Sequence, residues 1–425
     1  MNVLVFPCGS EIGLEIHAAL CWQKDVRLYG VSSVVDHGEL VYANYRKIIA
    51  SVDSDDFIAQ MNDLVREWGI DIIMPAHDSV FLRLAEALSA DELSTLAAVP
   101  ALWQARICRN KNETYTFLSG CNFIPECSVS TDGHYPIFAK PAVSQGSQGA
   151  EVVHDASRHM QLLENGIEYV FSEYLPGVEL TVDCLSDKEG LLKSVSPRQR
   201  CRIKSGISVR TQPVPLDEAI TLIAEQIAQK LQLKGAWFFQ LRQDIQGKWK
   251  LLEIAPRIAG SMGMSRHLGI NYPLLTLYAY LGVPFGVISQ YYPIVMERAL
   301  CSRYQIHMEY DQVYVDLDDT LIHRGRVHPV LVSLLYQWSD RGIPVHLITR
   351  HNESPVETLE KYRVAKSLFS SIIHVVDGLP KSKYMSEGRG VFIDDSFRER
   401  LEVRESLNFW VFDLDSIDQL IDWRE

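Results

Sequence analysis

Two aspartates one residue apart, Asp316 and Asp318, come directly after an apolar run that predicts a buried strand. Because side chains alternate along a strand, both carboxylates should leave the sheet on the same face. One can attack phosphorus while the other handles the proton of the leaving group. A solvated turn often carries such a pair too, so the interpretation depends on the residues further along the chain.

A hydroxyl and an amine suited to phosphate come later, in order. Thr349 ends a predicted strand and can donate to a phosphate oxygen. Lys381 or Lys383 can stabilise a phosphorylated aspartate, and the spacing to the next helix favours Lys381. All these groups should lie at the carboxyl ends of parallel strands, where open α/β sheets bind ligands.

Two more acids, Asp394 and Asp395, end a further predicted strand, Val391–Ile393. Either can hold Mg²⁺ beside Asp316. The expected metal ligands at this end of the chain are therefore Asp316, Asp318, Asp394 and Asp395.

Over residues 311–425 this set resembles the haloacid dehalogenase (HAD) superfamily. The resemblance implies a Rossmann-like domain in which Asp316 is the nucleophile, Asp318 the general acid/base, and Thr349 a phosphoryl ligand. The segments Thr320–Val345 and Arg350–Lys381 are too short for a cap domain, so we expect an open, capless site. A degenerate, purely structural domain is the alternative.

A second group of segments, in the middle of the chain, suits a nucleotide. Lys140 ends a predicted strand and can neutralise phosphate charge, and a turn with Gly146 and Gly149 lets backbone N–H groups approach phosphate oxygens. The extended segment 171–183 can pair with an adenine edge, and a carboxylate within it can hold ribose hydroxyls.

A predicted hairpin turning at Gln246-Gly247 completes this group. Its two antiparallel strands should bring Gln240 opposite Glu253, and such oxygen ligands suit Mg²⁺ on nucleotide phosphates. Arg257 can then offset phosphate or carboxylate charge. A surface ion pair at Glu253 and a solvated Lys140 remain the alternatives.

The order and spacing of these segments resemble the ATP-grasp superfamily over residues 1–300, closest to carbamoyl-phosphate-synthase-like and amino-acid ligase members. One position departs from its E-x-N-P-R motif, because Ala255 offers no oxygen to a metal. The resemblance implies these roles: Lys111 and Lys140 contact ATP phosphates, Glu173 and Leu175 the adenine, and Glu179 the ribose, with Gln240 and Glu253 as metal ligands and Arg257 at the reaction centre.

Alternating strand and helix patterns organise the chain into three expected domains. These are an N-terminal α/β pre-ATP-grasp domain (1–105), an α+β ATP-grasp domain (106–300) with one clear helix at Glu218–Leu231, and the HAD-like domain (301–425). Near the N-terminus, Gly9–Gly13 is either a phosphate cradle or a tight strand-to-helix turn.

An excess of acids, 54 against 41 basic residues for a net charge of −13, disfavours nucleic acid and anionic membrane as partners. The basic segment Arg198–Gly206 is an exception, which we interpret as a flexible loop over an anion rather than a solvated hairpin. The eight cysteines form no paired framework, so we expect reduced thiols and a cytoplasmic protein.

We therefore expect a bifunctional enzyme that uses ATP and Mg²⁺, or Mn²⁺ in its place. Its ligase part would join a carboxylate to an amine, and its phosphatase part would act on a phosphorylated small molecule. The alternative is a phosphatase regulated by a nucleotide-binding half, which Ala255 favours. A kinase acting on a small carboxylate is a third option, and a homo-oligomer is compatible with the sequence.

Overall fold

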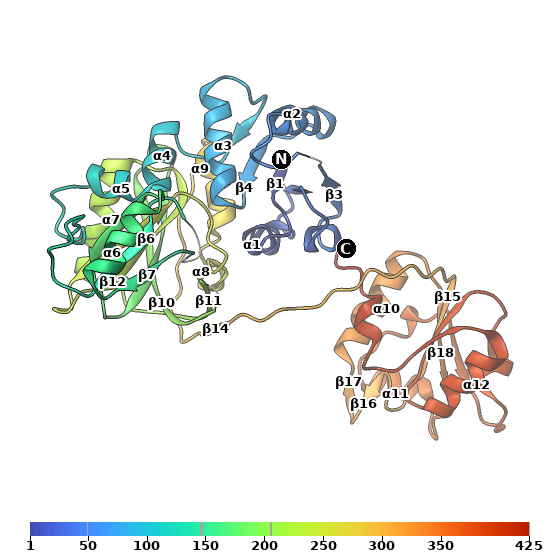
Figure 1. The fold of residues 1–425 in the computed structure, drawn as a ribbon. Coiled ribbons are helices and arrows are strands. Elements are labelled where there is room, and N and C mark those ends of the chain that lie inside the picture. Colours follow the sequence, from blue (N-terminus) through green and yellow to red (C-terminus); the bar gives the residue numbers. More distant parts are fainter. Residues whose placement is uncertain (49, 145–147, 205, 425) are drawn as a thin grey trace. The chain divides into compact units, whose positions relative to one another are not determined.

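The computed structural model describes residues 1–48, 50–144, 148–204 and 206–424. The chain divides into two compact units, Met1–Cys301 and Ser302–Glu425, which Figure 1 colours from blue to yellow and from yellow-orange to red. All eight cysteines are free. Within the described ranges, no helix combines the length and the apolar character that crossing a bilayer requires.

The first unit begins with a parallel sheet in the order β3-β2-β1-β4-β5. Its elements are β1 (Asn2–Phe6), α1 (Glu11–Leu20), β2 (Arg27–Ser32), the short helix η1 (His37–Leu40), β3 (Asn44–Lys47), α2 (Phe57–Trp68), β4 (Ile72–Pro75), α3 (Asp78–Ser89) and β5 (Leu96–Ala97). Because side chains alternate along β1, Val3 and Val5 pack towards α1 while Leu4 and Phe6 pack towards α2 and α3. This is the parallel α/β arrangement that the sequence predicts.

The turn between β1 and α1 is a packing turn. Ser10 caps α1 by accepting from the backbone N–H of Gly13 at 3.0 Å. A Cβ at Gly9 would lie 2.0 Å from the carboxylate carbon of Asp36, and one at Gly13 would lie 2.3 Å from the carbonyl oxygen of Cys8. Close packing therefore requires both glycines, and a carboxylate occupies the place where a phosphate cradle would need a cation or N–H group.

The rest of the first unit holds two antiparallel sheets, β7-β6-β8 and β13-β12-β9-β10-β11-β14. Their strands are β6 (Ile137–Pro141), β7 (Glu151–Val153), β8 (Tyr169–Glu173), β9 (Glu179–Ser186), β10 (Leu192–Lys204), β11 (Ile207–Pro213), β12 (Gly235–Gln243), β13 (Trp249–Ala255) and β14 (Met296–Glu297). The helices are α4 (Leu102–Arg109), α5 (Lys111–Phe117), α6 (Ala156–Glu164), α7 (Glu218–Leu231), α8 (Gly263–His267) and α9 (Tyr272–Leu281).

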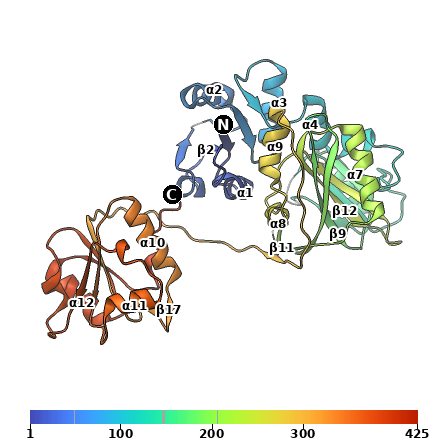
Figure 2. The same ribbon diagram turned by 180° about the vertical axis from the view of Figure 1, so that it is seen from behind.

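Helix α7 is the one helix that the sequence predicts here, with the predicted bounds. It lies along the larger sheet in Figure 2, where Ile223 and Ile227 share a core with Trp237 and Phe239 of β12. The other helices are short and were not expected, and α4 runs through the boundary predicted at residue 105. Since Phe238 points the opposite way along β12, it joins the core shared with α1 and α9.

The second unit is a parallel sheet in the order β19-β18-β15-β20-β21. Its elements are β15 (Gln312–Val315), β16 (Ile322–His323), β17 (Arg326–Val327), α10 (Pro329–Asp340), β18 (Val345–Thr349), α11 (Pro355–Lys361), η2 (Lys366–Leu368), β19 (Ser371–His374), η3 (Lys381–Tyr384), β20 (Gly390–Ile393), α12 (Phe397–Leu407), β21 (Trp410–Phe412) and η4 (Ile417–Leu420).

Helices cover both faces of this sheet. Leu334 of α10 and Leu359 of α11 pack on one face, and Val403 of α12 packs on the other. Strand order reverses between β15 and β20, and this switch point is where a doubly wound sheet opens a crevice for ligands. The short hairpin β16–β17 after β15 was not expected, but it leaves the segment before β18 far smaller than a cap domain.

Candidate functional site

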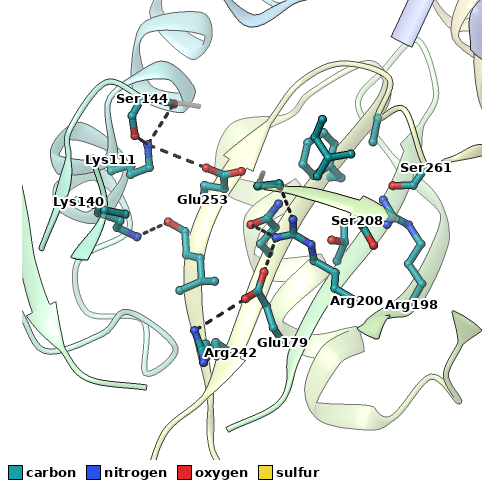
Figure 3. A pocket seen from close by; sticks show the side chains of 18 of the residues that line it. Lys111, Lys140, Ser144, Glu179, Arg198, Arg200, Ser208, Arg242, Glu253 and Ser261 are labelled. Atoms are coloured by element: carbon teal, nitrogen blue, oxygen red, sulfur yellow. Dashed lines mark hydrogen bonds and ion pairs between the residues drawn. The ribbon is translucent and has the colours of Figure 1, made fainter. Parts of the chain in front are cut away.

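A pocket in the first unit collects most of the residues that the sequence singled out in residues 1–300. Its cavity volume is about 310 Å³, and its walls come from both antiparallel sheets and from the start of α1. Figure 3 shows two lysines on one side and the arginines of β10 on the other. The predicted residues that line it are Lys111, Lys140, Glu173, Leu175, Glu179, Gln240, Glu253 and Arg257.

The two lysines are buried, and each is held by its own partners. Lys111, the first residue of α5, donates from Nζ to Oγ of Ser144 at 3.2 Å and lies 4.0 Å from the carboxylate of Glu253. Lys140 donates from Nζ to the hydroxyl of Tyr115 at 2.7 Å and to the carbonyl of Leu252 at 2.8 Å. No pattern in the sequence indicated Tyr115, which lies on α5 and fixes the direction of the Lys140 amine.

Burial and neighbouring positive charges lower the pKa of both amines. Desolvation lowers the pKa of Lys140 to about 7, the charge of Lys111 adds to this, and Glu253 opposes it. Desolvation also lowers the pKa of Lys111, again opposed by Glu253. Two buried cations with one nearby acid form a site that favours an added anion.

The hairpin of β12 and β13 pairs Gln240 directly with Glu253, as the sequence predicted. Directly opposed residues share a face of the sheet, so the amide oxygen and the carboxylate both turn into the pocket. Both are ligand types that Mg²⁺ accepts. Ala255, opposite Phe238, has only a methyl group to offer at the position where the family motif places an oxygen.

Arginines hold Glu179, the predicted ribose carboxylate. Arg200 of β10 donates to it, and Nη1 of Arg242 lies 3.9 Å from it. Arg200 also reaches the amide oxygen of Gln240 at 3.5 Å and the carbonyl of Gly206 at 2.7 Å. The guanidinium of Arg200 thus lies between the predicted ribose and metal ligands.

The predicted adenine segment, 171–183, runs from the end of β8 into β9, and Glu173 is the last residue of β8. The carboxylate of Glu173 accepts from the backbone N–H of Glu126 at 3.0 Å and lies 3.6 Å from Nζ of Lys250, so its side chain is engaged. Leu175 is buried against the pocket. In the part of the chain that the structure describes, no hydrogen bond forms at its backbone N–H or carbonyl.

The glycine turn is described only in part. Gly146 lies outside the described residues. Gly149 has φ of +70°, and a Cβ there would lie 2.9 Å from the ring of Pro141, so both conformation and space require glycine.

Arg257 forms an ion pair with the first residue of α3. Its Nε and Nη2 donate to the carboxylate of Asp78 at 2.6 and 2.7 Å, and its guanidinium lies over the ring of Phe238. Burial alone would raise the pKa of Asp78, but the charge of Arg257 lowers it. His77 precedes it as the N-cap of α3.

The basic segment, predicted as a flexible loop over an anion, is instead formed by the paired ends of β10 and β11. Nor is it a simple solvated hairpin, because its base is buried. Arg198 is 1% exposed and pairs with Asp183 through Nε at 2.8 Å and Nη2 at 2.9 Å. Only its outer part, including Arg202 and Lys204, is exposed.

In the second unit, the ends of β15 and β20 bring a lysine between two acids. Nζ of Lys381 lies 2.6 Å from a carboxylate oxygen of Asp316 and 2.6 Å from one of Asp394, and all three residues are buried. Burial raises the pKa of Asp316 and of Asp394, while the Lys381 charge opposes it. In turn the two acids raise the pKa of Lys381 although burial acts against this.

The acids at this end of the sheet also form a group that could hold a metal ion. Asp316, Asp394 and Asp395 each offer an oxygen, and these oxygens lie within 4.8 Å of one another. Within the described ranges, this is the one such group of three His, Cys, Asp or Glu side chains. Thr320 supports it by accepting from the backbone N–H of Asp395 at 3.0 Å.

Two predicted residues lie outside this cluster. Lys383 is exposed, because the short helix η3 turns its side chain away from Lys381. Asp318 is not among the metal-capable acids. Its carboxylate instead meets Nδ1 of His351 at 2.9 Å and, at 3.5 Å, the hydroxyl of Thr349. His351 was not singled out from the sequence, although it lies only two residues after Thr349.

Part of this sequence is similar to proteins of the ATP-grasp type. Residues 167–297 match a family model described as ATP-grasp in the biosynthetic pathway with Ter operon. The carbamoyl phosphate synthase large chain of Clostridium perfringens is 27% identical over 136 residues, and that of Clostridium botulinum is 26% identical. The match covers 29% of this chain and only 13% of those proteins.

Solved structures resemble a larger part of the chain. The biotin carboxylase domain dimer of 2-oxoglutarate carboxylase from Hydrogenobacter thermophilus, solved with MgADP, ADP and bicarbonate, superposes with a TM-score of 0.56 at 15% identity, over 68% of this chain and 71% of that one. The ADP complex of N5-carboxyaminoimidazole synthetase from Staphylococcus aureus gives 0.55 at 15% identity, over 70% and 82%.

Proposed function

Because this chain has the α/β ATP-grasp fold, with a pre-ATP-grasp sheet and a grasp region, we propose that it is an ATP- and Mg²⁺-dependent ligase joined to a phosphatase. The ligase converts a carboxylate to an acyl phosphate, which an amine then attacks with release of phosphate. The observation that carries this is one pocket holding two buried lysines beside an opposed Gln240–Glu253 pair.

In the proposed ligase, Lys111, Lys140 and the glycine turn with Gly146 and Gly149 bind the ATP phosphates. Among the described residues nothing bonds to the backbone groups of Leu175, which favours adenine pairing there, with Glu173 shaping the segment. Mg²⁺ held by Gln240 and Glu253 would offset phosphate charge. Glu179 binds the ribose hydroxyls after its hydrogen bond with Arg200 has broken. Arg257 neutralises negative charge at the reaction centre.

We propose an aspartate-based phosphatase for the second unit. A carboxylate oxygen of Asp316 attacks phosphorus while the bond to the leaving oxygen breaks, and Asp318 gives that oxygen a proton. Water then attacks the aspartyl phosphate, Asp318 takes its proton, and inorganic phosphate leaves. Lys381 and Thr349 stabilise the phosphoryl oxygens, and Asp316, Asp394 and Asp395 would hold Mg²⁺, whose charge favours the reaction.

The proposed domains are 1–105, 106–300 and 301–425, the last of HAD type and without a cap. A small carboxylate, an amine and a phosphorylated small molecule are the proposed substrates, and a homo-oligomer is the proposed assembly. The missing oxygen at Ala255 favours a second candidate, a phosphatase whose ATP-grasp half only senses nucleotide.

Purified protein given ATP, Mg²⁺ and pooled carboxylates and amines distinguishes these two. The ligase releases ADP only when a productive pool is present, and mass spectrometry then identifies the new amide. Tight ATP binding without ADP release from any pool would favour the sensor instead.

A further inference from the structure

His351 joins the exposed carboxylate of Asp318 to helix α11. Its ring Nδ1 lies 2.9 Å and 3.0 Å from the two carboxylate oxygens of Asp318, and its Nε2 lies 2.8 Å from the hydroxyl of Thr358. The Asp318 side chain is 52% exposed, whereas that of His351 is 17% exposed and Thr358 is buried. A fixed ring therefore contacts a carboxylate that is otherwise largely free.

The backbone of His351 is also fixed. Its N–H donates to Oγ1 of Thr349 at 3.1 Å, and its carbonyl lies 2.6 Å from Nε2 of His374. Three elements thus hold His351: the ends of β18 and β19 contact its backbone, and α11 contacts its ring. Among the described residues, the Asp318 side chain has one further hydrogen bond besides those with His351. It is a long one, 3.5 Å from the Thr349 hydroxyl.

The contacts of the ring define a consistent pattern of donors. A neutral imidazole donates from one nitrogen only. If the hydroxyl of Thr358 donates to Nε2, then the proton lies on Nδ1 and can be donated to Asp318. This places Thr358 behind His351 as the group that selects the useful tautomer.

We propose that His351 is a positioning residue that holds Asp318 in the orientation for proton transfer to the leaving oxygen. The proposal rests on the proposed phosphatase function of the second unit. An exposed carboxylate samples several rotamers, and general acid catalysis needs it within hydrogen-bond reach of one oxygen. The hydrogen bond from Nδ1 to both oxygens removes much of that freedom.

Leaving-group basicity provides the readout. When the phosphoryl group of p-nitrophenyl phosphate is transferred to Asp316, the leaving p-nitrophenolate is a weak base and needs little protonation. The phenolate that leaves phenyl phosphate is a stronger base and needs the proton of Asp318. Since kcat/KM covers the steps up to release of the leaving group, loss of positioning should lower kcat/KM for phenyl phosphate far more than for p-nitrophenyl phosphate.

Two substitutions at the same position form a matched pair. His351→Gln places its amide near the former Nε2 and loses the contact with Asp318, while His351→Asn keeps a donor near the former Nδ1. We expect His351→Gln to lower kcat/KM for phenyl phosphate by about tenfold to a hundredfold. His351→Asn should recover most of this, and Thr358→Val should show a smaller loss of the same kind.

The experiment is run on the full chain with Mg²⁺, with Asp316→Asn and Asp318→Asn beside it. If Asp316→Asn abolishes the hydrolysis, the activity belongs to the proposed phosphatase site. Asp318→Asn shows how kcat/KM for the two esters changes when the general acid is lost entirely. An unchanged inhibition constant for inorganic phosphate shows that His351→Gln leaves the site folded.

If His351→Gln affects both substrates equally, or neither, then His351 does not position Asp318 and the proposal is overturned while the phosphatase stands. If the wild-type chain hydrolyses neither ester, the phosphatase function fails and the role of His351 fails with it.

Discussion

Asp78, the first residue of α3, and Arg257, which follows β13, form a two-point ion pair across 179 residues of sequence. Each side chain is only 13% exposed. Removing one partner of such a pair leaves a nearly buried charge without compensation. We therefore expect Asp78→Ala to lower the free energy of unfolding of the first unit by about 3 kcal/mol, measured in urea.

The exposed pair Arg46–Glu67 is the matched control, with side chains 46% and 49% exposed. Glu67→Ala should cost below about 1 kcal/mol. Because Arg257 lowers the pKa of Asp78, the pair stabilises the fold above the unfolded-state pKa of about 3.9, and the advantage over Asp78→Asn should fade below it. If Asp78→Ala and Glu67→Ala lower the free energy of unfolding equally, then Asp78 is not a buried partner of Arg257.

The lowered pKa of Lys140 leads us to expect that nucleotide affinity depends on pH. Its pKa is about 7 in the free protein, and a bound phosphate would keep it charged. Below pH 7 the Lys140 amine is already protonated before the nucleotide binds, so the nucleotide affinity has its highest value there. Above pH 7 binding must also take up a proton, so affinity should fall by up to about tenfold per pH unit.

Calorimetry of Mg-ADP binding in buffers of different ionisation enthalpy measures that proton uptake. Lys140→Arg is the control, since an arginine stays charged and should remove this part of the pH dependence. Proton uptake that is the same in both proteins would mean that Lys140 does not face the phosphates.

His159 should make the smaller antiparallel sheet sensitive to acid. It is fully buried beside Phe171, and its Nε2 has no hydrogen-bond partner in the part of the chain that the structure describes. Burial lowers its pKa, so the neutral ring stabilises the fold above the unfolded-state pKa of about 6.5, and this stability is lost as pH falls below that value.

Protection factors of the amides of β6 and β8, obtained by dividing the intrinsic exchange rate at each pH by the observed rate, measure this loss between pH 7.5 and 5.5. His159→Phe should remove the difference between the two pH values, whereas the exposed His154→Gln should keep it. Acid sensitivity that survives His159→Phe would assign the effect to another group.

Local patterns allowed much of this molecule to be predicted. The apolar runs indicated β1, β2 and β4 of the first parallel sheet and β15, β18, β19 and β20 of the second, but not the strands β3, β5 and β21. The turn at Gln246-Gly247 indicated that β12 pairs with β13, whereas the exact opposition of Gln240 and Glu253 depends on a shift of register next to Gln240. Acids at strand ends predicted Asp316 and Asp394 together, because parallel strands place their carboxyl ends at one edge.

Contacts between distant segments were not predictable in this way. Arg257 meets Asp78 only where α3 packs beside the segment that follows β13, and Arg200 meets Glu179 only because β9 and β10 are neighbours in the sheet. The choice between Lys381 and Lys383 depended on the turn of η3, whose direction no periodicity encodes. Nor did the sequence indicate that Asp318 contacts His351, which lies two residues beyond the end of β18.

The most direct test of the two-site account compares Glu253→Ala with Asp316→Asn in the full chain. Two activities are measured in each: ADP release that requires a carboxylate and an amine, and hydrolysis of p-nitrophenyl phosphate. We predict that Glu253→Ala abolishes the first and spares the second, and that Asp316→Asn does the reverse. ATP-dependent product formation that survives Glu253→Ala would contradict the account, because the pocket of the first unit would then not be the site of ligation.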